Sequence, residues 1–153
     1  MDALVIKLLK KHEGFVDHIY YCTAGKKTIG YGYNIEANPL KLSAEKIAGF
    51  SQYGITDLAA TALLIECVKA LEFTLYKKIA CWPKLSEVRQ AVLLDMAFNL
   101  GVEGLLSFKN MLACLNRADY ITATEHMLNS QWRSQVKQRA IELANLLLTG
   151  KSA

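Results

Sequence analysis

Three residues near the N-terminus, Glu13, Cys22 and Thr28, are of types that could do acid–base chemistry, and they stand at short intervals. Eight residues separate Glu13 from Cys22, five separate Cys22 from Thr28, and residues 29–32 follow with the sequence IGYG. A carboxyl group can protonate a leaving oxygen, and a hydroxyl can hold a water molecule. A thiol, with a reference pKa of about 8.5, supplies a weak hydrogen-bonding contact or, beside a cation, a thiolate.

The acid is expected at the end of a helix. Apolar residues of the segment 2–12 recur at helical spacing, and Gly14 provides a stop signal just beyond it. Glu13 then lies at a helix C-terminus, where the macrodipole disfavours a carboxylate and helps to keep it protonated, as a general acid requires. The alternative is an ordinary surface glutamate in a last helical turn.

The thiol and the hydroxyl are expected on a hairpin. Residues 19–22 form a short alternating segment, residues 23–25 (TAG) a turn, and residues 28–32 a second strand rich in glycine and β-branched residues. Residues 34–39 have the composition of a loop. A carboxylate at a helix end that faces a hairpin would be held at the rim of a groove.

The rest of the chain is predicted to be helical. The longest apolar period begins at Asp57 after the cap Thr56 and continues to about residue 79, a helix roughly 35 Å long at 1.5 Å per residue. Residues 86–101 are apolar on nearly all faces, which predicts a buried helix that ends at Gly101. Shorter elements complete the prediction: a helix 43–50 capped by Ser43, a turn 52–54, helices 102–106 and 108–116, the latter capped by Ser107, a helix from Asp119 to 129, a turn 130–132 and a helix 136–148.

Length and composition indicate one folded domain. The chain has 153 residues, 52% of them hydrophobic and 21% charged, and no apolar run approaches the roughly 18 to 20 residues that span a bilayer. The N-terminus lacks the features of a signal peptide. The formal charge of +4 is not concentrated in any lysine or arginine run longer than two residues, which argues against a nucleic-acid binder. Four cysteines lack metal-ligand spacing, and free thiols are expected.

The spacing of Glu13, Cys22 and Thr28, followed by IGYG, resembles the catalytic signature of the phage-type lysozyme family, in which Asp or Cys occupies the middle position. A second motif agrees with this resemblance: Arg89 followed by residues 96–101, MAFNLG. The resemblance covers residues 3–150 in matching order. It implies an α+β, lysozyme-like fold with a small antiparallel sheet lobe at about 13–56, a connecting helix at 57–79, and a larger all-helical lobe comprising residues 80–150 and the helix 2–12.

The resemblance also implies a glycoside hydrolase, a muramidase that cleaves the β-1,4 bond between N-acetylmuramic acid and N-acetylglucosamine with inversion. Glu13 would be the general acid, Thr28 would position the attacking water, and Cys22 would occupy the place of the second carboxylate. Arg139 would pair with the acid, although it can equally be a solvated helix charge. Sugar contacts are expected from three further residues, Asn34, Phe98 and Asn99, of which Phe98 can also be a core aromatic.

This interpretation carries expectations about partners and location. Glycan strands of peptidoglycan would be the partner, with no cofactor, no metal, no nucleic acid, no stable membrane insertion and a monomeric state. An endolysin of this kind would be made in the host cytoplasm and reach periplasmic peptidoglycan through a holin pore, while a toxin would be delivered by other means. A second hypothesis is a catalytically impaired module that binds the wall, with cysteine in place of aspartate as the lesion. A third, a small helical nucleic-acid binder, has only the +4 charge in its favour.

Overall fold

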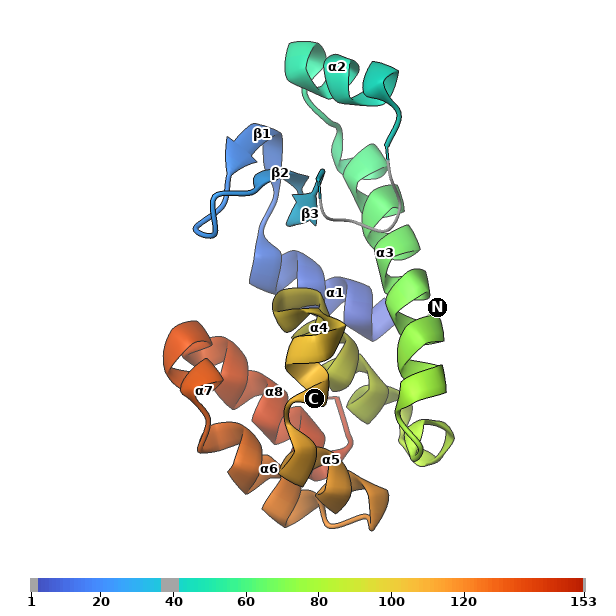
Figure 1. The fold of residues 1–153 in the computed structure, drawn as a ribbon, viewed down its shortest axis with the longest axis vertical. Helices are drawn as coiled ribbons and strands as arrows, with labels where there is room; N and C mark the ends of the chain where they lie inside the picture. Colours follow the sequence, from blue (N-terminus) through green and yellow to red (C-terminus); the bar gives the residue numbers. More distant parts are fainter. Residues whose placement is uncertain (1–2, 37–41, 153) are drawn as a thin grey trace. The chain divides into compact units, whose positions relative to one another are not determined.

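The computed structural model describes residues 3–36 and 42–152, and Figure 1 shows its elements. The described elements are, in chain order, α1 (Ala3–Glu13), β1 (Val16–Tyr21), β2 (Lys27–Gly30), β3 (Tyr33–Asn34), α2 (Ala44–Tyr53), α3 (Asp57–Lys78), the 3₁₀ turn η1 (Trp82–Lys84), α4 (Glu87–Leu106), α5 (Lys109–Asn116), α6 (Tyr120–Leu128), α7 (Gln131–Val136) and α8 (Gln138–Thr149). This helix-rich chain with a small antiparallel sheet confirms the predicted α+β, lysozyme-like fold class.

The chain divides into two compact units, which are described separately. Among the described residues, the first comprises 6–36 and 42–70, and the second comprises 3–5 and 71–152. The helix α3 passes from one unit into the other, since its residues 57–70 belong to the first and 71–78 to the second. The boundaries of the predicted lobes stay a prediction.

The sheet of the first unit is a three-stranded antiparallel meander in the order β1-β2-β3. The second predicted strand, residues 28–32, was too long: it ends at Gly30. Gly30 and Gly32 have φ values of +68° and +64°, a region that residues with a Cβ rarely adopt, so the chain reverses there and returns as β3. The first strand begins at Val16, earlier than the predicted residue 19, and its register is interrupted by a bulge before Tyr20.

Contacts with the helices of the first unit fix the sheet. The carbonyl group of Asp17, in the bulge of β1, accepts a hydrogen bond of 2.8 Å from the N–H of Ile55, just before α3. Gly30 lies so close to α3 that a Cβ there would be 3.0 Å from the Cβ of Ala60. The predicted cap Ser43 accepts a hydrogen bond from the N–H of Lys46, and α2 continues to Tyr53 through part of the predicted turn 52–54.

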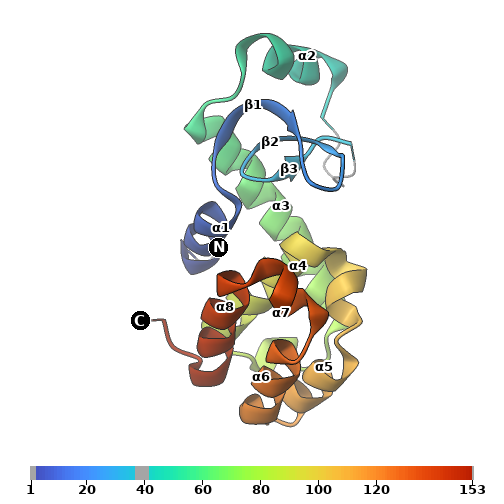
Figure 2. The same cartoon turned by 90° about the vertical axis from the view of Figure 1, so that its left-hand side faces the viewer.

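The second unit is built around α4, and Figures 1 and 2 show α5, α6 and α8 around it. The segment 91–97 of α4 is buried without interruption, as its apolar sequence predicts. At Gly101, where the sequence predicts an end, the backbone has φ +78° and the helix is kinked. The carbonyl groups of Leu147 and Leu148 at the end of α8 accept hydrogen bonds from the guanidinium group of Arg89, at 2.7 and 2.9 Å.

Two local predictions in the second unit were wrong. Ser107 does not cap the following helix, because its hydroxyl donates to the carbonyl of Gly104 at 2.6 Å, and α5 begins after Phe108. Residues 130–132 are not a turn: Ser130 accepts a hydrogen bond from the N–H of Arg133 and caps α7. The loop prediction for residues 37–39 lies outside the described residues.

Candidate active site

Glu13 is the last residue of α1, at the sharp reversal that leads into β1. The reversal is made by Gly14, which has φ +72° and donates its N–H to the carbonyl of Lys10 at 3.0 Å. The side chain of Glu13 is half-buried. The predicted position of the acid at a helix C-terminus is therefore the observed one.

The chain reversal after the second strand approaches the Glu13 carboxyl group closely. A Cβ added to Gly32 would lie 2.9 Å from Oε2 of Glu13 and 3.1 Å from its Cδ. Together with the positive φ of Gly32, this proximity leaves room only for glycine. The motif IGYG thus places a bare backbone segment against the acid, a surface to which a ligand could come close.

Cys22 and Thr28 lie on the two sides of the β1–β2 hairpin. The N–H of Cys22 donates to the carbonyl of Lys26 at 3.0 Å, and the N–H of Gly25 donates to the carbonyl of Cys22 at 2.8 Å, which closes the turn. Thr28 is only 3% exposed, and its hydroxyl donates to the carbonyl of Lys26 at 2.9 Å. Two of the three signature residues are thereby fixed by one turn.

The hairpin backbone is arranged to favour a thiolate at position 22. The backbone N–H groups of Lys26 and Ala24 lower the pKa of the Cys22 thiol, and the hydroxyl of Thr28 adds to that effect. The single hydroxyl proton of Thr28 serves either the carbonyl of Lys26 or the sulfur, so the thiolate form requires it to turn. Of the four free cysteines, Cys22 alone is half-exposed while the other three are buried.

One face of the sheet carries a row of three side chains across all three strands. Thr28 is paired with Tyr20 on β1 and with Asn34 on β3. Residues directly opposite one another in adjacent strands project to the same face, so Asn34, the predicted sugar contact of this unit, lies in the same row as Thr28. The Oδ1 atom of Asn34 accepts a hydrogen bond from the N–H of Glu36 at 3.0 Å.

Tyr20 is not among the residues that the sequence predicted for the site. In the structure its phenol group lies within the electrostatic influence of the site: burial is the largest cause that raises the pKa of Tyr20, and the charges of Glu13 and Cys22 add to it. The signal was present in the chain, because Tyr20 stands two positions before Cys22 and alternate residues of a strand share a face.

The other predicted site residues, Phe98, Asn99 and Arg139, belong to the second unit. Phe98 is half-buried near the end of α4. The Oδ1 atom of Asn99 accepts a hydrogen bond of 2.7 Å from Nε1 of Trp132, a core residue that is 3% exposed. Their predicted sugar contacts stay predictions.

Arg139 makes an ion pair in the interior of the second unit. Its Nε donates to Oδ1 of Asp95 at 2.8 Å, and the Asp95 side chain is fully buried while that of Arg139 is 10% exposed. The solvated charge that the sequence left open as an alternative is therefore not what the structure has at this position. The predicted pairing of Arg139 with Glu13 stays a prediction.

Neither a cluster of possible metal ligands nor a single membrane-spanning helix occurs in the described part of the chain. Within residues 3–36 and 42–152, no group of three or more His, Cys, Asp and Glu side chains could hold a metal ion. No single helix of these ranges is long and apolar enough to cross a bilayer, and the one pair that passes on length and composition, Glu87–Leu106 with Lys109–Asn116, is bent by 95°.

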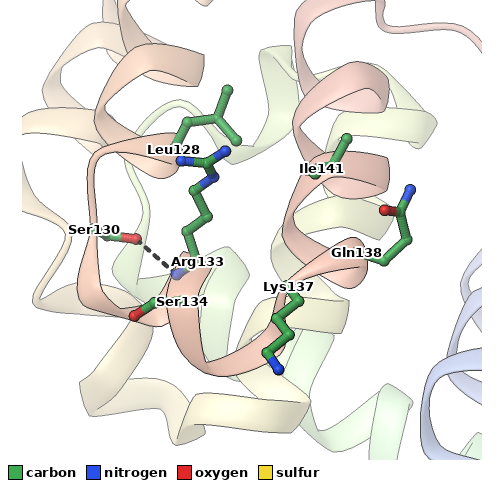
Figure 3. A pocket seen from close by; sticks show the side chains of 7 residues that line it. All are labelled: Leu128, Ser130, Arg133, Ser134, Lys137, Gln138 and Ile141. Atoms are coloured by element: carbon green, nitrogen blue, oxygen red, sulfur yellow. Dashed lines mark hydrogen bonds between the residues drawn. The ribbon is translucent and has the colours of Figure 1, made fainter.

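A cavity of about 470 Å³ in the second unit is not a convergent site. Figure 3 shows that Arg133 and Lys137, its two cations, extend in opposite directions. None of the signature residues borders it. Its lining residues are Leu128, Ser130, Arg133, Ser134, Lys137, Gln138 and Ile141.

Comparison with known proteins finds similarity over most of the chain. A family model described as phage lysozyme matches residues 10–146. The chain is 29% identical over 157 residues to the pre-baseplate central spike protein Gp5 of Enterobacteria phage T4, a match that covers 94% of this chain and 27% of that protein. It is 29% identical over 170 residues to probable T4-type lysozyme 1 of Dictyostelium discoideum, covering 98% of this chain and 96% of that protein. The chain thus spans about a quarter of the phage spike protein and nearly all of the second relative.

Proposed function

Because the chain belongs to the phage lysozyme family, we propose that it is a peptidoglycan hydrolase of the muramidase type. Its substrate would be the β-1,4 bond between N-acetylmuramic acid and N-acetylglucosamine. The observation that carries this proposal is the clustering of the signature residues: Gly32 packs against the Glu13 carboxyl group, and Thr28 shares a hairpin with Cys22.

In the proposed reaction Glu13, in its protonated form, donates its proton to the departing glycosidic oxygen. A water molecule held by the Thr28 hydroxyl attacks the anomeric carbon from the opposite face, which inverts its configuration. The thiolate of Cys22 accepts one proton of that water. The new C–O bond replaces the glycosidic bond, and the enzyme is left with an anionic Glu13 and a protonated Cys22, which exchange protons with solvent before the next cycle.

The lowered pKa of the Cys22 thiol supports its role as proton acceptor. An unperturbed thiol is mostly neutral at pH 7 and would be a poor base. The N–H groups of Lys26 and Ala24 increase the thiolate fraction by hydrogen bonding to the sulfur. With Cys22 as the proton acceptor, the reaction needs only one carboxyl group, that of Glu13, as the proton donor.

The measurement that tests the function is the release of new reducing ends from purified peptidoglycan. The wild-type protein is expected to release them, and Glu13→Gln to release none, because the amide cannot donate a proton to the leaving oxygen. The matched control is Asp17→Asn, which also removes one carboxylate from the first unit, at an exposed position where it pairs with His18. Unchanged product release by Glu13→Gln would contradict the assignment of the acid.

A second candidate function is favoured by one observation, the thiol at the place where many family members carry a carboxylate. A module that binds the wall without turnover would sediment with purified peptidoglycan yet release no reducing ends in the wild-type form. A muramidase, by contrast, would both sediment with peptidoglycan and release reducing ends.

The muramidase proposal includes a biological role. The protein would act as an endolysin, made in the host cytoplasm and released to periplasmic peptidoglycan through a holin, or as a delivered toxin. It is then expected to clear a suspension of chloroform-treated Gram-negative cells.

A further inference from the structure

The sheet of the first unit presents adjacent tyrosines to opposite faces. Tyr20 is paired with Thr28, and Tyr21 is paired with Lys27. Because successive residues of a strand alternate, Tyr20 projects to the face of Thr28, while Tyr21 projects to the other face and is 67% exposed. The ladder continues by one pair through the Cys22–Lys26 hydrogen bond, so Cys22 shares the face of Tyr20.

The phenol group of Tyr20 is half-buried and remains neutral over the whole neutral range. Burial raises its pKa first, and the negative charges of Glu13 and Cys22 raise it further. Those two groups, one from α1 and one from the hairpin, are the charges that raise the pKa of Tyr20 among the residues that the structure describes. The titratable residues on its own strand other than Tyr21 are Asp17 and His18, which are exposed and lie 3.0 Å apart between Oδ1 and Nδ1.

We propose that Tyr20 is a positioning residue of the site, whose phenol hydroxyl supplies a neutral hydrogen-bond donor to the anionic forms of Cys22 and Glu13. The catalytic role of Tyr20 rests on the proposed function. Its effect on the ionisation of Cys22 does not depend on turnover and can be measured separately. The phenol has one O–H proton and donates it to one anion at a time, to the Cys22 thiolate before proton transfer and to the Glu13 carboxylate after it. A hydrogen bond to a charged group is stronger than one to a neutral group, so the anionic form is stabilised in each case.

The first experiment measures the ionisation of Cys22 directly, without substrate. The rate of alkylation by iodoacetamide is followed against pH in the wild type, in Tyr20→Phe and in the matched control Tyr21→Phe, which loses the same hydroxyl on the opposite face. The reagent reports on Cys22 because the other three cysteines are buried, and loss of labelling in Cys22→Ser verifies this. Tyr20→Phe is expected to raise the midpoint by about one pH unit, which slows alkylation at pH 7 about tenfold.

The Tyr21→Phe control and a test of folding decide whether a shift in Tyr20→Phe supports the inference. Tyr21→Phe is expected to follow the wild-type curve, and equal circular dichroism spectra show that Tyr20→Phe is folded. A Tyr20→Phe curve that superimposes on the wild type overturns the inference. An equal shift in both phenylalanine variants overturns it as well, because that would be a general property of the strand.

The second experiment links the thiol to turnover through the pH profile of kcat/KM. If Cys22 accepts the proton of the water, the acid limb of the profile reports its ionisation, and that limb is expected to move to higher pH in Tyr20→Phe by the same amount as the alkylation midpoint. If the acid limb of kcat/KM is unchanged while the alkylation midpoint is shifted, Tyr20 affects the ionisation of Cys22 but has no role in catalysis. Absence of turnover in the wild type would contradict the proposed function alone, since the alkylation curves still decide the role of Tyr20.

Discussion

The carboxyl group of Glu13 occupies the space into which a side chain at Gly32 would have to project. A Cβ at position 32 would be 2.9 Å from Oε2 of Glu13, closer than real Cβ contacts come. This relationship joins the acid at the end of α1 to the chain reversal between β2 and β3. It makes glycine at position 32 a determinant of where the acid points.

Gly32→Ala is expected to displace the Glu13 carboxyl group, because the end of the flexible glutamate side chain can move away from the added Cβ more easily than the backbone can. The displaced acid would no longer be in position to donate its proton, so kcat should fall at least tenfold. The control is Gly25→Ala, since Gly25 has a similar φ of +75° but a Cβ there would have nothing within 4 Å. Both variants should lose about 1 to 2 kcal/mol of unfolding free energy from the left-handed backbone. Chemical denaturation and product release check this pair, and equal activity of the two variants would contradict a role for the Gly32–Glu13 contact.

Substitutions of Cys22 test whether ionisation of its thiol contributes to product release. Cys22→Asp is expected to keep product release and to extend it to lower pH, because a carboxylate with a reference pKa of about 3.9 stays ionised where a thiol is protonated. The lowered pKa of Cys22 means that activity of the wild type is lost as the pH falls through that lowered value. Cys22→Ser keeps the size and removes the ionisation, so it should be the least active of the three. A serine variant as active as the wild type across the pH range would show that ionisation at position 22 is dispensable.

The acid and the hairpin could be located from sequence because their signals are local. The helical period before Gly14 and the turn at residues 23–25 depend on neighbouring residues only, and the structure has Glu13 at the end of α1 and the turn within the hairpin. The cap of α7 was equally local but was missed: Ser130 had the right chemistry, but residues 130–132, which include the start of the helix, were predicted to be a turn.

The parts that sequence reasoning missed depend on residues far apart in the chain. β1 starts early because the carbonyl of Asp17 bonds to the N–H of Ile55. The strand 28–32 is divided because Gly30 approaches Ala60 and Gly32 approaches Glu13, and no local pattern reveals either contact. Tyr20 is a different case, because its alternation with Cys22 is local and visible in the sequence, whereas its pairing with Thr28 depends on the register across the hairpin.

Loss of one member of the ion pair between Asp95 and Arg139 is expected to destabilise the second unit. Arg139→Met would leave the fully buried Asp95 carboxylate without this partner, and removal of one member of a buried pair typically costs about 3 to 5 kcal/mol. The control is Lys69→Met, which breaks the exposed pair of Lys69 with Glu66 at 3.7 Å, where a loss of about 0 to 1 kcal/mol is expected. Urea denaturation checks both values. A similar loss in the two variants would mean that burial of the Asp95–Arg139 pair does not determine its contribution.

Asp119 gives a prediction about stability and pH. It caps α6 by accepting a hydrogen bond from the N–H of Thr122 at 3.1 Å. The side chain of Thr122 and then its backbone N–H lower the pKa of Asp119. A carboxyl group with a lowered pKa in the folded state stabilises the protein above its unfolded-state pKa, and this stabilisation is lost as the pH falls through the folded-state value. Asp119→Asn keeps a good cap but removes the charge.

The difference in unfolding free energy between the wild type and Asp119→Asn should therefore favour the wild type at pH 7 and shrink as the pH is lowered past the titration of Asp119. Urea denaturation at several pH values measures this difference. Asp17→Asn serves as the comparison, because Asp17 is also an exposed aspartate but its only described polar side-chain contact is with His18. A wild-type advantage at Asp119 that stayed constant down to low pH would show that the cap acts through hydrogen-bond geometry and not through its charge.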